Sequence, residues 1–130
     1  MKEIFCKLQK CREKIKEMNL ENNIHFDGWV ENIAAWLEDK QYIVSTSVLE
    51  GHPVGIMEAM ARGLKPIIHN YVGARGTYPE KYLWNTIPEF VSMVRDDDYK
   101  SFEYRQFIET HHTLNNQLKG IQQIVKRISR

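Results

Sequence analysis

Segments with a helical spacing of apolar residues alternate along the chain with segments that have a strand-like spacing. Apolar residues first recur at intervals of four, three, four and three, which predicts an amphipathic helix over residues 3–18 with an inward face formed by Ile4, Leu8, Cys11, Ile15 and Met18. The sequence IHF then predicts a short strand at residues 24–26, ended by Asp27 and Gly28. WVENIAAWLED predicts a helix over residues 29–39, with an inward face formed by Val30, Ile33, Trp36 and Leu37.

The middle of the chain holds the clearest strand pattern. QYIVSTS, residues 41–47, is a nearly continuous run of apolar and β-branched residues, as expected for a strand that is covered on both faces. A helix is predicted to begin near Pro53 and to end at Gly63, a helix-terminating glycine in the left-handed conformation. Its expected inward residues are Val54, Met57, Met60 and Ala61. KPIIH predicts a third strand at residues 65–69, followed by a glycine-bearing loop and a short turn.

The last third of the chain is predicted to be helical. Thr86 and Glu89 have the spacing of a capping box for a helix over residues 87–95, and the acidic run at 96–98 predicts a solvated turn rather than a metal site. Two further helices are expected at about 99–110 and 113–129. The last of them carries one apolar face, formed by Leu114, Leu118, Ile121, Val125 and Ile128.

Alternation of this kind predicts an α/β fold with a truncated, Rossmann-like parallel sheet of about three strands, helices on both faces and a helical C-terminus. Ligands of such sheets bind beyond the carboxyl ends of the strands. Glu50 follows the strand that contains Val44 and should therefore lie at that edge.

The sequence LEGHPVGIMEAMARG, residues 49–63, carries the candidate chemistry. Glu50 stands among turn-forming residues, and Glu58 stands eight positions later within the predicted helix. The start of that helix offers backbone amides to an anion, and Gly51 and Gly55 have no side chain to hold a ligand away from the backbone. Two carboxylates beside an anion-binding helix start suit a sugar nucleotide, because a carboxylate accepts two hydrogen bonds from a vicinal diol. The spacing alone also leaves open a structural or surface role for the pair.

These residues resemble the C-terminal domain of the family 4 retaining glycosyltransferases, which have a GT-B fold of two facing Rossmann-like domains. The family pattern is a strand ending in Ser, then Glu-Gly-x-Pro, then Glu-Ala-Met-Ala-x-Gly, then a strand opening near Pro. The corresponding segments here are STSVLEGHP, EAMARG and KPII, with IHFDGWV before them, so the resemblance covers about residues 20–75.

The resemblance implies a donor-binding site for a nucleotide sugar. In the family, the first glutamate faces the donor hexose and the second binds the ribose hydroxyls, which assigns these roles to Glu50 and Glu58. Glu50 is then the catalytic residue, and the implied donor-binding set is Glu50, Gly51, His52, Pro53, Val54, Gly55 and Glu58. His52 replaces a commoner aromatic or apolar residue, so an ordinary loop role for it stays open. The loop around Gly73 departs from the family form and contributes no assigned residue.

Composition and charge argue against several other classes of function. The 130 residues carry 18 basic and 17 acidic side chains, a balance that argues against a nucleic-acid-binding protein. No metal or cofactor is expected, and His69, His111 and His112 are predicted to be a strand-end residue and two exposed helix-end residues. No apolar run is long enough to span a membrane, and Cys6 and Cys11 are placed too far apart for a disulfide. Free cysteines without an export signal predict a cytoplasmic protein.

The resemblance also defines what else the enzyme would need. Family members have an N-terminal acceptor domain, which is absent from residues 1–130, and the C-terminal domain begins with elements that precede the helix predicted at 3–18. The sequence is therefore expected to be part of a C-terminal domain, inactive by itself, with the missing domain as a partner. A non-catalytic nucleotide-sugar-binding or interaction module and a plain α/β scaffold remain alternatives. The exposed apolar helix face predicts self-association, and its basic residues suit either solvent or the inner face of a membrane: Lys119, Lys126, Arg127 and Arg130.

Overall fold

The structure, a computed structural model, describes residues 2–129 and the side chains of residues 8–129. The chain divides into two compact units, with the boundary between Glu31 and Asn32. The candidate site lies within the second unit.

Helix α1 (Lys2–Glu17) is the main element of the first unit and confirms the helix predicted at 3–18. Two residues beyond its end, Asn19 adopts a left-handed conformation with φ 54° and donates its N–H to the carbonyl of Lys16 at 3.1 Å. The side chains of the expected inward face are more exposed than predicted, since Ile15 alone among those described is half-buried. The side chains of Ile4 and Cys6 lie outside the described residues.

The prediction of a strand at residues 24–26 is wrong. Residues 24–30 adopt no regular secondary structure, and none of the described strands pairs with this segment. A short apolar alternation forms a strand only where a neighbouring strand satisfies its backbone groups. Without that pairing, Ile24 and Phe26 are exposed, and the Phe26 ring instead lies 5.2 Å from the guanidinium carbon of Arg12.

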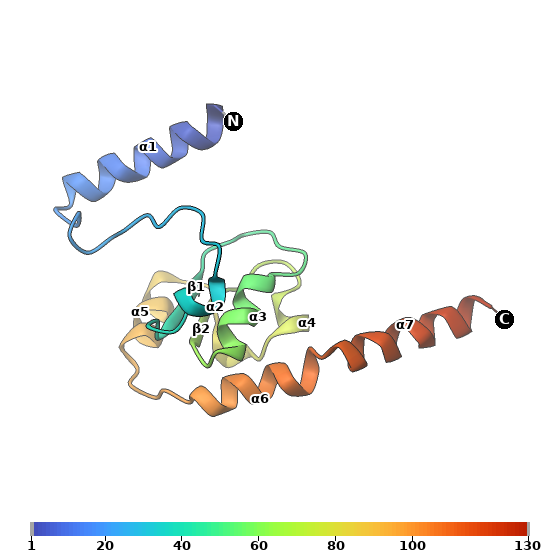
Figure 1. The fold of residues 1–130 in the computed structure, drawn as a ribbon. Coiled ribbons are helices and arrows are strands. Elements are labelled where there is room, and N and C mark those ends of the chain that lie inside the picture. Colours follow the sequence, from blue (N-terminus) through green and yellow to red (C-terminus); the bar gives the residue numbers. More distant parts are fainter. Residues whose placement is uncertain (1, 130) are drawn as a thin grey trace. The chain divides into compact units, whose positions relative to one another are not determined.

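A three-stranded parallel sheet forms the centre of the second unit (Figure 1). Its strands lie in the order β1 (Tyr42–Ser45), β2 (Lys65–His69) and β3 (Leu83–Trp84). Val44 pairs with Ile67 across the first ladder, and Ile68 pairs with Leu83 across the second. The predicted α/β class and parallel sheet are therefore confirmed, although β3 takes the place of the strand expected at 24–26.

Helices cover both faces of this sheet. Helices α3 (Val54–Ala61) and α6 (Ser101–His111) cover one face, and α5 (Ile87–Arg95) packs against β2 and β3. On the first face Ile68 and Leu83 join a buried cluster with residues of these helices, Ile56, Met57, Met60 and Tyr104. On the other face the Trp84 ring meets the Phe90 ring edge-on, with 5.3 Å between their centroids.

Strand β1 is an edge strand of the described sheet, which corrects its expected burial on both faces. The exposed fractions of Tyr42 and Val44 are 37% and 44%, whereas Ile43 points to the other side and packs into the core. The cause is that α5 covers β2 and β3 rather than β1. The fully covered strand is β2, in which Lys65 to Ile68 are all buried.

Two predicted helices differ from the sequence interpretation in detail. Helix α2 is limited to Ile33–Trp36. It begins after Asn32, because the Asn32 side chain caps it by accepting the N–H of Ala35 at 3.0 Å. The buried residue of this segment is Leu37, which follows the helix. In α3 the buried residues are Ile56, Met57, Ala59 and Met60. Val54 and Ala61 are exposed instead, since they lie on the side of α3 that turns away from the sheet.

The remaining elements follow their local sequence signals. Helix α5 begins with the predicted capping box, in which Thr86 accepts the N–H of Glu89 at 3.4 Å and Glu89 accepts the N–H of Thr86 at 3.0 Å. Helix α4 (Ala74–Thr77) and a single 3₁₀ turn, η1 (Glu80–Tyr82), occupy the predicted loop before β3.

Helix α7 (Leu114–Ile128) ends the described chain and exposes its apolar face. The exposed fractions along that face range from 46% at Leu118 to 79% at Ile128, and no residue of the helix is buried. Thr113 caps the helix by accepting the N–H of Asn116 at 3.2 Å. Among residues 2–129, no helix has the length and apolarity needed to cross a membrane.

We predict that Gly63→Ala destabilises the second unit by about 1–3 kcal/mol. Gly63 has φ 91° and ends α3, where its N–H donates to Met60 at 2.9 Å and the N–H of Leu64 donates to Ala59 at 3.0 Å. An added Cβ would also collide with the Ser101 hydroxyl. The measurement is the free energy of unfolding in urea. The matched control is Gly120→Ala within α7, where a Cβ meets no atom within 4 Å; it should be neutral or stabilising, and equal losses for both variants would contradict the prediction.

We predict that the chain associates through the apolar face of α7, because exposed apolar stripes of this kind promote self-association. Ile121→Glu, which places a charge in the middle of that face, should shift the chain to monomer in sedimentation equilibrium. Gln123→Glu adds the same charge away from the apolar residues and should leave the association unchanged. A wild-type chain that stays monomeric at high concentration would disprove this.

Candidate functional site

The loop that follows β1 is held beside the end of β2. Because the two strands are parallel, their carboxyl ends lie at the same edge of the sheet, where ligands of such folds bind. The ring nitrogen Nδ1 of His69, the last residue of β2, lies 3.0 Å from the carbonyl oxygen of Ser47. This contact fixes the loop to the neighbouring strand, three residues before Glu50.

Glu50 is half-buried in this loop, near two tyrosines that follow β2. Tyr71 and Tyr78 are buried, and neither phenolic oxygen has a hydrogen-bond partner. Burial raises the pKa of Tyr71, and the charge of Glu50 raises it further. Burial, Tyr71 and Glu50 together raise the pKa of Tyr78. Two uncharged O–H donors are therefore held in the electrostatic field of the Glu50 carboxylate.

The two tyrosines were missed as site residues in the sequence interpretation. The sequence predicts a glycine-bearing loop and a short turn over residues 70–82, and this prediction assigns no role to the tyrosines. The signal in the sequence is the pair of tyrosines on either side of the glycines, because a large aromatic ring in a loop can pack into the core and fix the position of the loop. Both rings belong to the main hydrophobic cluster.

The predicted backbone positions lie at the amino end of α3. Pro53 is the N-cap residue, one position before the first turn, and its carbonyl accepts the N–H of Ile56 at 3.1 Å. Gly51, His52, Val54 and Gly55 are exposed, and a Cβ added at either glycine would meet no atom within 4 Å. The surface at this helix start is thus open to a ligand.

Glu58 lies in different surroundings from Glu50. It is exposed on α3 and lines a hollow of about 240 Å³ between α2 and α3, together with Ile33, Leu37 and Arg62. The Arg62 guanidinium donates to the carbonyl of Ala34 at 2.7 Å and pairs with another carboxylate, that of Glu38, at 3.1 Å. The structure therefore surrounds Glu50 with tyrosines of the loop after β2, and Glu58 with residues of α2.

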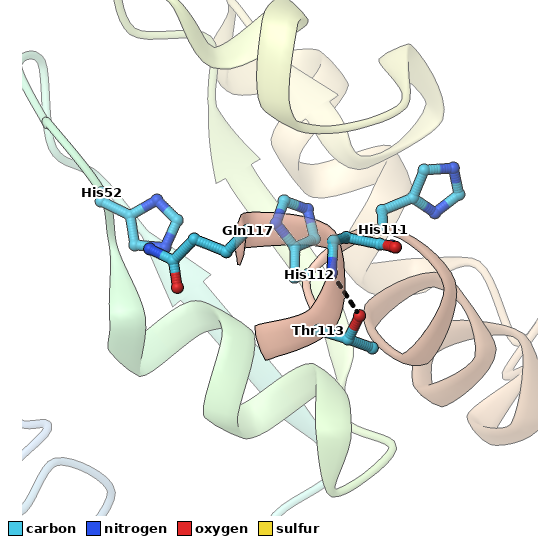
Figure 2. Close-up of a pocket in the computed structure, with 6 residues that line it drawn as sticks. His52, His111, His112, Thr113 and Gln117 are labelled. Carbon is cyan, nitrogen blue, oxygen red and sulfur yellow. Dashed lines mark hydrogen bonds between the residues drawn. The ribbon is translucent and has the colours of Figure 1, made fainter. Parts of the chain in front are cut away.

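His52 lines a second cavity, with residues at the junction of α6 and α7 (Figure 2). The cavity has a volume of about 270 Å³ and is lined by His52, His111, His112, Thr113, Asn116 and Gln117. Burial lowers the pKa of His112, and the neighbouring imidazoles of His52 and His111 lower it further, while a hydrogen bond with the Thr77 backbone opposes them. His112 was predicted to be an exposed helix-end residue and is instead half-buried, because the chain turns between α6 and α7 at this point.

Other charged clusters of the second unit are structural. Lys65 is buried, and its Nζ donates to the carbonyl of Asp96 at 2.6 Å and lies 3.4 Å from the carboxylate of the same residue. The acidic run at 96–98 is exposed, as predicted for a turn. In the part of the chain that the structure describes, no three His, Cys, Asp or Glu side chains are grouped as a metal site requires.

Comparison with known proteins identifies a family. The sequence pattern of the family described as Glycosyl transferases group 1 matches residues 5–91. The chain is similar to Protein CapJ of Staphylococcus aureus, with 29% identity over 79 residues, and to the poly(glycerol-phosphate) alpha-glucosyltransferase of Bacillus subtilis (strain 168), with 24% identity over 110 residues. These matches cover 58% and 76% of this chain, but 20% and 16% of the two relatives. No solved structure shows a significant match.

We predict that Tyr78→Phe leaves the free energy of unfolding unchanged or raises it by up to roughly 1 kcal/mol, because it removes a buried hydroxyl that has no partner. The matched comparison is Tyr82→Phe. The hydroxyl of Tyr82 donates to Glu103 at 3.0 Å, so its loss should cost about 1 kcal/mol. Urea denaturation of both variants measures the difference. A larger loss for Tyr78→Phe than for Tyr82→Phe would show that the Tyr78 hydroxyl is paired in solution.

Proposed function

The chain belongs to the group 1 glycosyltransferases, and we propose that it forms the donor-binding part of a retaining enzyme of this family. The proposed reaction transfers a hexose from a nucleoside-diphosphate sugar to a saccharide, lipid or protein acceptor. The observation that carries the proposal is the position of Glu50: the loop that holds it leaves β1 at the carboxyl edge of a parallel sheet and leads directly into α3.

Glu50 is proposed to bind the hexose. A half-buried carboxylate accepts hydrogen bonds from sugar hydroxyls more strongly than an exposed one, because less water competes for it. The O–H groups of Tyr71 and Tyr78 lie in its field without protein partners, and they are available to orient the carboxylate. This arrangement supports a role for Glu50 close to the reacting carbon.

Glu58 is proposed to bind the ribose. Its exposed carboxylate lies at the rim of the hollow between α2 and α3, whose other lining residues include the apolar Ile33, Ala34, Leu37 and Ala61. A carboxylate beside an apolar surface suits a ribose diol joined to a flat base. The backbone amides at the start of α3 lie between the two glutamates in sequence, where a diphosphate would meet the positive end of the helix dipole.

The name of one relative supports the transfer of a hexose to a polymer. One relative is named as a glucosyltransferase acting on poly(glycerol-phosphate), so glucose is the first donor sugar to test. The chain spans about a fifth or less of the length of the two relatives it matches. Catalysis also requires a bound acceptor, whose positioning supplies several kcal/mol. Binding of the donor, rather than transfer, is therefore the appropriate assay for these residues.

The proposal predicts millimolar binding of the donor by this chain. The helix dipole contributes at most ~2 kcal/mol, and with one or two carboxylate contacts the sum approaches the ~4 kcal/mol of millimolar affinity. NMR titration should show tighter binding of UDP-glucose than of UDP. Glu58→Ala should weaken both ligands by about tenfold, whereas Glu50→Ala should remove the difference between them.

Glu13→Ala, in helix α1 of the first unit, is the control for the change in net charge and should alter neither affinity. GDP and GDP-glucose, titrated in the same way, test the choice of base. Micromolar binding that neither substitution of Glu50 or Glu58 affects would place the nucleotide elsewhere and refute the assignment of both residues.

A further inference from the structure

The cavity that His52 lines is rich in hydrogen-bond donors. The Nε2 atom of His112 is buried without a protein partner, and His52 faces it with 6.3 Å between the ring centroids. Gln117 extends its side-chain amide into the same space (Figure 2). Thr113 accepts the N–H of Asn116 through its hydroxyl oxygen at 3.2 Å, which leaves its own O–H free to donate.

His111 is the third imidazole of the cavity. Its Nδ1 lies 2.9 Å from the carbonyl oxygen of Phe107, and its ring stacks on the Phe107 ring with 4.7 Å between centroids. These contacts fix the orientation of the His111 ring. The centroids of His111 and His112 are 6.5 Å apart, so three imidazoles surround the cavity at short range.

No carboxylate balances these imidazoles among the residues that line the cavity. The nearest charged residues along the three lining segments are Glu50, Glu109 and Lys119, and none of them lines it. Protonated imidazoles here would repel one another, and the lowered pKa of His112 has this repulsion as its second cause after burial. A bound anion would offset this repulsion.

We propose that the cavity formed by His52, His111, His112, Thr113 and Gln117 is a binding site for a tetrahedral oxyanion, that is, a phosphate group. Its volume of about 270 Å³ accommodates a phosphate with several waters, since a water in the liquid occupies roughly 30 Å³. The donors come from the loop after β1 (His52), from the end of α6 (His111 and His112) and from the start of α7 (Thr113 and Gln117). Nothing in the roles proposed for Glu50 and Glu58 uses His111, His112 or Gln117.

Two chemical sources can supply this phosphate group: the diphosphate of a nucleotide sugar, and a phosphate ester or free phosphate that is separate from the donor. Both present the same oxyanion to the imidazoles. They differ in whether a nucleoside is attached, and therefore in whether Glu58 contributes to binding.

Binding should strengthen as the pH falls. A protonated imidazole donates two hydrogen bonds and carries a positive charge, whereas a neutral one donates a single bond. Since burial and the neighbouring imidazoles lower the pKa of His112, a bound anion should raise it again by favouring the protonated form.

The experiment follows the ring resonances of the five histidines by NMR while inorganic phosphate is added to the full chain. The signals of His52 and His112 should shift with a common, saturable affinity, and the signal of His25, in the first unit, should not. Sulfate keeps its charge in this range, and it should bind at least about tenfold more tightly near pH 5.5 than near pH 7.5. His52→Gln and His112→Gln should each lower the affinity for phosphate by about tenfold or more, and His25→Gln should leave it unchanged.

Two comparisons separate the sources and the outcomes. If the site holds the donor diphosphate, His52→Gln weakens UDP and phosphate in parallel; if it holds a separate phosphate, UDP and phosphate bind to the chain together. Glu58→Ala should leave phosphate unaffected in either case, so a failure of the nucleotide assignment does not affect this test. Equal shifts of His25 and His112, or the same shifts with chloride at matched ionic strength, would overturn the proposal. Because His52 is exposed, the His52→Gln result stands even if His112→Gln unfolds the chain.

Discussion

The burial of strand β2 is the constraint on which the rest of the second unit depends. The strand pairs with β1 on one side and with β3 on the other, and its first four residues are buried. Parallel pairing brings the carboxyl ends of β1 and β2 to the same edge, so the loop after β1 has to pass the end of β2. There Ser47 meets His69, and Glu50 comes close to the tyrosines beyond β2. The position of the candidate site is thus a consequence of parallel strand pairing and not of any property of Glu50 itself.

The amino end of the same strand buries a charged side chain, that of Lys65. Lys65 opens β2 with an exposed fraction of 7%, and a buried ammonium group is costly unless it is paired and hydrogen-bonded. Its Nζ reaches Asp96, the residue that caps the carboxyl end of α5, where a helix favours a cation. Hydrogen bonding from the Asp98 N–H and the contact with Lys65 lower the pKa of Asp96. This pairing holds α5 against the amino end of β2, which is the end of the sheet opposite Glu50.

Elements whose signal is local were predicted from the sequence, and elements that depend on a partner were not. The capping box of Thr86, the left-handed Gly63 and the apolar run of β2 all lie within a few residues, and each is confirmed. Residues 24–26 show a strand alternation without a neighbouring strand, whereas Leu83 and Trp84 show almost no alternation and form a strand because β2 offers them one. The same division holds for the candidate site: spacing indicates Glu50 and Glu58, but no spacing could indicate that the fold places tyrosines near Glu50 and two further histidines near His52.

The loop between β1 and α3 carries groups of opposite chemistry within three residues. The Glu50 carboxylate is a hydrogen-bond acceptor whose charge acts on the buried phenols, while the His52 imidazole can donate a hydrogen bond and lies beside the ring of His112. A sugar phosphate carries the matching groups: hydroxyls that donate hydrogen bonds, next to phosphate oxygens that accept them. Successive residues of an extended segment point to opposite sides, so residues 50 and 52 would share a side in a regular strand, and the bend of the chain at Gly51 turns them toward different partners. The φ angle of Gly51 is one that other residues adopt, so the path of the loop, and not the missing side chain, directs Glu50 and His52 to different partners.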